Sequence, residues 1–181
     1  MLTSPNLSSL LILLFVAIFI SVISSVIFLN KRISLAYVRI HICLVALPPL
    51  IAFVGLILAP KNINIGLWYS DILSWLMAFF VLIIGLIIQR YCVQYLMGDR
   101  SYRKYFTLFT ITTSFAAMAW LTGDLRIMVV SWGITLLGLT LLISLTSAWK
   151  VTRAAAKVTG KLFLLSWIAL LLAVVWMTLL T

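Results

Sequence analysis

The chain has 181 residues, of which 65% are hydrophobic and only 9% are charged. Soluble domains average about 45–50% apolar and about 25% charged residues, so a water-soluble globular fold is excluded. Thirteen basic residues stand against three acidic ones, and His41 is the only histidine. Paired-carboxylate hydrolysis, a multi-histidine metal site and a Ser-His-Asp triad therefore lack their components. We expect no enzyme activity from this chain alone, and no metal or cofactor bound to it.

Uncharged apolar stretches define the predicted elements, because a membrane-spanning helix needs about 17–25 such residues. Five stretches meet this length, and a sixth qualifies when Arg39 and His41 are tolerated near its start. In chain order, the six predicted helices cover residues 10–29, 36–59, 72–88, 105–121, 127–149 and 162–180. The stretches are continuous rather than alternating, which favours helices over a membrane β-barrel. We predict an all-α integral membrane protein with six transmembrane helices, forming one membrane domain over residues 1–181.

Most basic residues fall into three of the gaps between predicted helices. The gaps after the first, third and fifth helices hold ten of them: Lys31, Arg32, Arg90, Arg100, Arg103, Lys104, Lys150, Arg153, Lys157 and Lys161. The positive-inside rule places these gaps in the cytoplasm and both termini outside, as in a multi-pass protein of a bacterial inner membrane. This topology and binding to anionic lipid account for the net charge of +10, so we expect no nucleic-acid partner.

Two ionisable residues near the start of the predicted helix 36–59 are candidates for a proton path, because charge at membrane depth marks function. Arg39 either extends its side chain back to the cytoplasmic surface or presents a fixed cation to a buried water path. His41 lies deeper and about 200° around the helix from Arg39, so the two cannot share a face. Its ring suits a proton relay, or it is a buried histidine bonded to a neighbouring hydroxyl or backbone group.

Further polar candidates lie around the turn before the predicted helix 127–149. Asp124 and Arg126 form either a local ion pair or the outer end of a proton path. The helices 105–121 and 127–149 on either side are rich in threonine and serine. These hydroxyls either line hydrated cavities or hydrogen-bond between helices, and the sequence leaves both readings open.

Residues 147–161 are predicted to form a basic amphipathic loop on the cytoplasmic side. Lys150, Arg153, Lys157 and Lys161 recur at spacings of three, four and four residues, which places them on one face of a helix. Such a stripe binds anionic lipid headgroups or an acidic partner protein.

The chain from Asp71 onward carries an ordered set of motifs. They are Asp71-Ile72-Leu73-Ser74, Tyr91 and Tyr95, Gly98-Asp99, Arg103-Lys104-Tyr105-Phe106 and Ser131-Trp132. This order resembles the N-terminal third of the antiporter-like membrane subunits of respiratory complex I and the Mrp antiporters. The stretch 132–142 and the Ala-rich basic run 153–157 resemble more narrowly the DabB-type membrane subunits of DAB inorganic-carbon accumulation complexes.

The resemblance implies a membrane subunit that conducts protons and couples the proton motive force to accumulation of carbon dioxide or bicarbonate. Because the family is much longer than this chain, it implies a split N-terminal portion and a second membrane subunit that supplies the remaining helices. It also implies a DabA-like cytoplasmic partner, similar to carbonic anhydrases, to which the zinc would belong. Arg100, Arg103 and Lys104, with the basic stripe of residues 147–161, form the face where that partner would dock.

Three positions depart from the family pattern and keep other functions open, the first being Lys104, where the family usually has arginine. Complex I relatives have a glutamate where this chain has Gly133, and DabB-type subunits have a histidine where it has Thr140. One alternative is a subunit of a complex I, hydrogenase or Mrp-type cation–proton antiporter assembly. The other is a membrane scaffold subunit that keeps the helical frame but conducts nothing.

Overall fold

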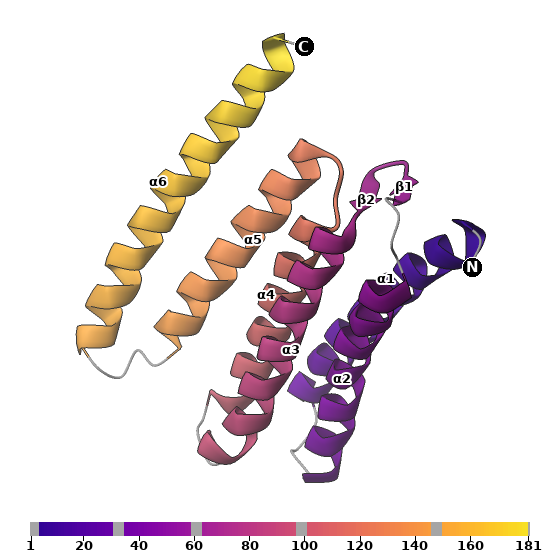
Figure 1. Cartoon of the computed structure of the whole chain (residues 1–181). Coiled ribbons are helices and arrows are strands. Elements are labelled where there is room, and N and C mark those ends of the chain that lie inside the picture. The colour runs from indigo at the N-terminus through magenta and orange to yellow at the C-terminus, as the bar shows by residue number, and fades with distance from the viewer. Residues whose placement is uncertain (1–3, 31–34, 59–62, 97–100, 146–149, 181) are drawn as a thin grey trace.

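The computed structural model describes residues 4–30, 35–58, 63–96, 101–145 and 150–180. Six helices run up and down in chain order, and a short hairpin lies between the second and third (Figure 1). The elements are α1 (Ser4–Asn30), α2 (Leu35–Leu58), β1 (Ile63–Ile65), β2 (Trp68–Ser70), α3 (Ile72–Tyr95), α4 (Tyr102–Trp120), α5 (Leu125–Ser144) and α6 (Lys150–Leu180). The prediction of an all-α membrane fold is confirmed.

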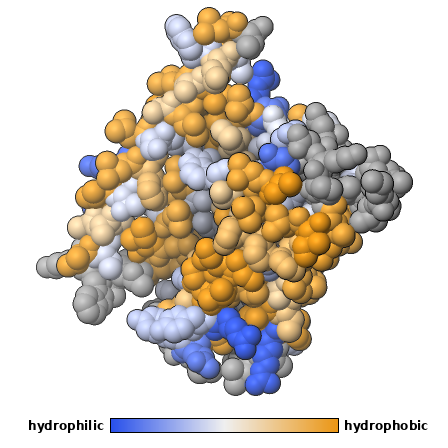
Figure 2. All heavy atoms as spheres, viewed as in Figure 1, coloured by the Kyte–Doolittle hydropathy of each residue, from blue (hydrophilic) through white to orange (hydrophobic). Residues whose placement is uncertain are grey.

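Large apolar side chains are exposed along the helices, as expected for surfaces that face lipid. Figure 2 shows hydrophobic residues over most of the visible face and hydrophilic residues gathered chiefly at its lower end. Within the described residues, five helices are long and apolar enough to cross a membrane, and α4 is not among them. The α4 sequence contains two basic residues, several threonines and one serine, which lower its hydropathy, and its buried hydroxyl residues lie where it packs against α1, α3 and α5.

Several helix ends differ from the predicted ones because an uncharged stretch is shorter than the helix that contains it. Helix α3 continues past residue 88 to Tyr95, and α4 already begins at Tyr102. The described part of the predicted loop 147–161 is the first turns of α6, continuous with the apolar remainder of that helix. Alanine, lysine and arginine are strong helix formers, so the chain has no local reason to leave the helix there.

The β1–β2 hairpin is hydrogen-bonded to the turn between α4 and α5. We call this end of the bundle the hairpin end. Strands β1 and β2 pair antiparallel around Gly66, whose φ of 59° is a conformation that glycine adopts without strain. The N–H of Tyr69 donates to Leu121 O at 3.2 Å, and the N–H of Gly123 donates to Leu67 O at 2.9 Å. The turn between α4 and α5 is thereby held against the hairpin.

Asp71 is the N-cap of α3, and its carboxylate accepts the N–H of Ser74 at 2.7 Å. This hydrogen bond lowers the pKa of Asp71 below its ordinary value of 3.8. Because the pKa of Asp71 is lower in the folded than in the unfolded chain, the ionised cap stabilises the fold at pH values above the unfolded-state pKa. This contribution is lost as the pH falls through the folded-state pKa and the carboxylate is protonated.

We therefore expect Asp71→Ala to lower the thermal unfolding midpoint at neutral pH, because an orphan N–H of the first turn loses its acceptor. The difference from wild type should be constant above about pH 5 and disappear in stronger acid. Thermal unfolding curves in detergent at a series of pH values measure it. Asp71→Asn is the matched control, since it keeps an acceptor oxygen without the titration; equal midpoints for Asp71→Ala and wild type at neutral pH would contradict the capping role.

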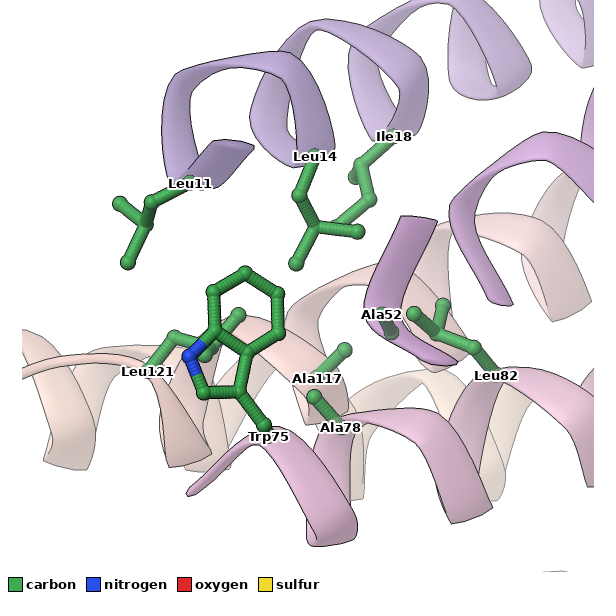
Figure 3. Close-up of a cluster of buried hydrophobic side chains, with 9 residues drawn as sticks. All are labelled: Leu11, Leu14, Ile18, Ala52, Trp75, Ala78, Leu82, Ala117 and Leu121. Carbon is green, nitrogen blue, oxygen red and sulfur yellow. The ribbon is translucent and has the colours of Figure 1, made fainter. Parts of the chain in front are cut away.

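The apolar core lies toward the hairpin end, centred on Trp75 of α3 (Figure 3). Its indole points toward Leu11 and Leu14 of α1 and is fully buried. On α2, Gly55 leaves room for the ring, since a Cβ at that position would collide with its six-membered half. Four helices, α1 to α4, thus share one apolar core.

Candidate functional site

Toward the other end, the bundle interior contains a group of buried polar side chains beside a smaller apolar cluster. Buried polar side chains from four helices gather there: Ser21, Ser24 and Ser25 of α1, His41 of α2, Gln89 of α3, and Thr107 and Thr110 of α4. We call these seven residues the polar cluster. Lipid-buried polar groups need protein partners, so such a concentration is a candidate functional site.

The cluster lies about two turns from the ends at which α1 and α3 finish and α2 and α4 begin. We call this the basic end, because Arg90, Arg103 and Lys104 are exposed there. The polar cluster is therefore on the side of the molecule that the positive-inside rule assigns to the cytoplasm.

His41 is the only titratable side chain of the polar cluster. Its ring is 3% exposed, and its Nδ1 lies 2.8 Å from Oγ of Ser24. Its edge meets the ring of Phe106 with the centroids 6.1 Å apart. The Gln89 side chain also interacts with the ring. The histidine therefore contacts α1, α3 and α4 at once.

Hydrogen bonds between helices join the rest of the cluster. Thr107 Oγ1 donates to Ser25 O at 3.0 Å, which links α4 to α1. Gln89 Nε2 donates to Thr110 Oγ1 at 3.2 Å, which links α3 to α4. Helices α1 to α4 are thus connected by polar contacts at this end as they are by apolar packing at the other.

Most other hydroxyls of α4 and α5 bond within their own helix. Thr112, Thr113, Thr135 and Thr140 each donate to the carbonyl four residues earlier, at 2.7–3.0 Å. These bonds satisfy the hydroxyls locally, so their number alone does not mark a hydrated cavity.

The structure separates the sequence-predicted proton-path candidates. Arg39 is exposed while His41 on the same helix is buried, as the predicted angle between them requires. Asp124 caps α5 by accepting the N–H of Arg126 at 2.8 Å, and the Arg126 side chain is exposed. Both residues lie at the hairpin end, far along the bundle from His41 (Figure 1).

The predicted docking residues lie at the basic end. Arg103 and Lys104 are exposed in the first turn of α4, and Arg153, Lys157 and Lys161 are exposed on the first turns of α6. Lys150 begins α6, and Arg100 lies outside the described residues. The part of the chain that the structure describes holds no group of three or more His, Cys, Asp or Glu side chains able to bind a metal.

Sequence reasoning missed Gln89 and the serines of α1. The predicted third helix stopped at residue 88, so Gln89 was counted as loop, whereas α3 carries it into the interior with no exposed surface. A buried amide at membrane depth is the signal that was available, since it requires a partner.

An apolar groove of about 600 Å³ lies between α5 and α6, lined by Gly133, Thr140, Gly160, Phe163 and Trp167 among others. Trp167 Nε1 donates to Val129 O at 3.0 Å and lies where a Cβ on Gly133 would be. The Trp167 indole therefore covers Gly133.

Comparisons with known proteins agree with this architecture. The family model "NADH-Ubiquinone oxidoreductase (complex I), chain 5 N-terminus" matches residues 58–106, and "NADH:quinone oxidoreductase/Mrp antiporter, TM" matches residues 122–181. A curated relative from Bacillus subtilis (strain 168), named "Probable inorganic carbon transporter subunit DabB", is 58% identical over 179 residues. A relative of the same name from Bacillus anthracis is 53% identical over 177 residues.

Both alignments cover 98% of this chain but only 35% of each relative. The chain thus spans about a third of the length of the curated relatives that it matches, at their N-terminal end. Two successive stretches of the chain thus match models of membrane domains of the complex I and Mrp antiporter type. The chain is therefore similar to antiporter-like membrane subunits, and over nearly its whole length it is similar to the N-terminal third of proteins named as probable inorganic carbon transporter subunits DabB.

Proposed function

We propose that the chain corresponds to the N-terminal part of the membrane subunit of a complex that uses the proton motive force to accumulate inorganic carbon as carbon dioxide or bicarbonate. The observation that carries the proposal is the 58% identity to a DabB relative over nearly the whole chain. The buried polar cluster supports it, because a polar interior at membrane depth is costly and is kept where charge or protons must move.

In this proposal, helices equivalent to the part of the relatives beyond the matched third complete the membrane subunit. Those helices pack into the groove between α5 and α6. Three observations support this surface: α6 stands at the edge of the bundle beside α5 (Figure 1), most of its side chains are exposed, and the groove is apolar.

The proposed cytoplasmic partner is a DabA-like zinc protein that hydrates carbon dioxide. It would dock on the basic end through Arg100, Arg103, Lys104, Lys150, Arg153, Lys157 and Lys161, which also bind anionic lipid. We place this end in the cytoplasm and both termini outside a bacterial inner membrane, following the positive-inside rule. The chain itself is then a transporter subunit rather than an enzyme.

A second candidate function is a subunit of a complex I, hydrogenase or Mrp-type antiporter assembly. The descriptions of the two matching family models favour it. Gly133 stands against it, because the glutamate that those relatives have at this position is missing and the Trp167 indole covers its place.

Co-purification from the native membrane in a mild detergent, with mass spectrometry of the partner chains, tests the proposal. We expect a zinc-containing, carbonic-anhydrase-like protein among the partner chains. Partners that carry quinone or iron–sulfur chemistry would support the second candidate instead. Transport of bicarbonate by the purified chain alone in liposomes, without that partner, would contradict the proposal.

A further inference from the structure

The hydroxyl of Ser24 decides which ring nitrogen of His41 carries the proton. Ser24 has one hydroxyl proton and two acceptors within reach: Ser21 O at 2.7 Å and His41 Nδ1 at 2.8 Å. When the proton points to Ser21, Ser24 accepts a hydrogen bond from Nδ1–H. When it points to Nδ1, the neutral ring carries its proton on Nε2.

The hydrogen bonds around Gln89 leave its amide oxygen available as an acceptor. Thr110 donates its hydroxyl proton to Phe106 O at 2.8 Å, so its oxygen can only accept from Gln89. The amide nitrogen of Gln89 must therefore face Thr110, which leaves the amide oxygen on the opposite side. Oε1 of Gln89 is fully buried and has no hydrogen-bond partner among the described residues, and the Gln89 side chain interacts with His41.

The Nδ1–H form of His41 has its partner in Ser24 on α1. Gln89 Oε1 on α3, which accepts no hydrogen bond in the described structure, is left to accept from the Nε2–H form. Phe106 packs edge to face with the ring, and the residue is almost fully buried, so the ring is held in place rather than turned toward solvent.

We propose that His41 is a two-sided proton-exchange site between α1 and α3, in which Gln89 is the positioning residue that stabilises the Nε2–H tautomer. In one exchange, a water molecule delivers a proton to Nε2. Nδ1 then releases its proton to Ser24 Oγ, whose own hydroxyl proton leaves to a second water molecule. One proton has moved, and the ring is neutral before and after. This proposal rests on the proton-coupled function proposed above.

The test uses the fact that His41 is the only histidine. Selective ¹⁵N-histidine labelling of the full chain in lipid bilayers therefore gives one imidazole signal set. The ¹⁵N shifts of the two ring nitrogens report which one carries the proton. We expect both tautomers to be populated in the wild-type chain.

Two substitutions should move the tautomer ratio in opposite directions. Ser24→Ala leaves a buried Nδ1–H without an acceptor in one tautomer and only an unprotonated Nδ1 without a donor in the other; because the unpaired N–H is the costlier of the two, the ratio should shift toward Nε2–H by roughly threefold or more. Gln89→Leu removes the partner of Nε2 and should shift it toward Nδ1–H by a similar factor. Ser24→Thr keeps the hydroxyl and should restore the wild-type ratio.

Thr135→Val is the matched control, because it removes a buried hydroxyl of α5 that bonds only to Ser131 O. Its ratio should equal that of wild type. A single tautomer that neither substitution moves, or shifts in the same direction, would overturn the proposal. The ¹⁵N measurement reports the tautomers of His41 and does not depend on transport. A negative result would therefore not affect the co-purification experiment, and the tautomer proposal and the proposed function are tested separately.

Discussion

Replacing Trp75 with alanine is expected to lower the free energy of unfolding by about 3–5 kcal/mol. The indole is fully buried and contacts side chains of α1 and α4 as well as its own helix. Gly55 of α2 adjoins the ring so closely that the cavity left by the substitution would open between α2 and α3. Thermal or denaturant unfolding of the purified chain in detergent measures the loss.

Two further variants separate core packing from a general effect of losing tryptophan. Trp176 of α6 is 67% exposed, so Trp176→Ala should change the free energy of unfolding by no more than about 0.5 kcal/mol. Trp75→Phe keeps an aromatic ring and removes the indole N–H, which has no hydrogen-bond partner within the described residues. Its loss should be much smaller than that of Trp75→Ala. Equal stability of Trp75→Ala and wild type would show that this cluster is not the core.

Replacing His41 with leucine is expected to reduce proton-coupled transport by the complete complex by roughly tenfold or more. Leucine fills the buried volume but carries no proton, so the polar cluster loses its only titratable side chain. The measurement is uptake of labelled bicarbonate driven by an imposed proton gradient, in proteoliposomes that contain the assembled complex.

Assembly must be checked alongside transport, because a buried substitution also affects packing. The His41→Leu complex should co-purify with the same partners as wild type, and Thr135→Val should transport normally. Unchanged uptake with intact assembly would remove His41 from the proton path. The same outcome after neutralising Arg39 and Asp124 as well would favour the scaffold alternative, in which the chain holds the complex together without conducting.

Hydropathy does not show which residues of the polar cluster lie close together in the fold. Ser24 and His41 are 17 residues apart and on different helices, and Thr107 and Ser25 are 82 residues apart. The sequence shows that each residue is polar within an apolar helix, but which helices adjoin depends on packing. Gly55 and Trp75 are another such pair, in which a missing side chain on α2 leaves the space that an indole of α3 fills.

Run length and composition alone determined the membrane class, because a bilayer offers no hydrogen-bond partner to the backbone and so requires long apolar helices. The order of short motifs from Asp71 to Trp132 predicted the similarity to antiporter-like subunits, and two family models of that type match the chain. Helix ends were predicted less well, since helices continue into charged residues such as Arg90 and Lys157 beyond the apolar run. Only the tertiary structure decided that His41 meets Ser24 and Gln89, and that Trp167 covers Gly133, because contacts between helices arise from side-chain shape and hydrogen bonding rather than from hydropathy.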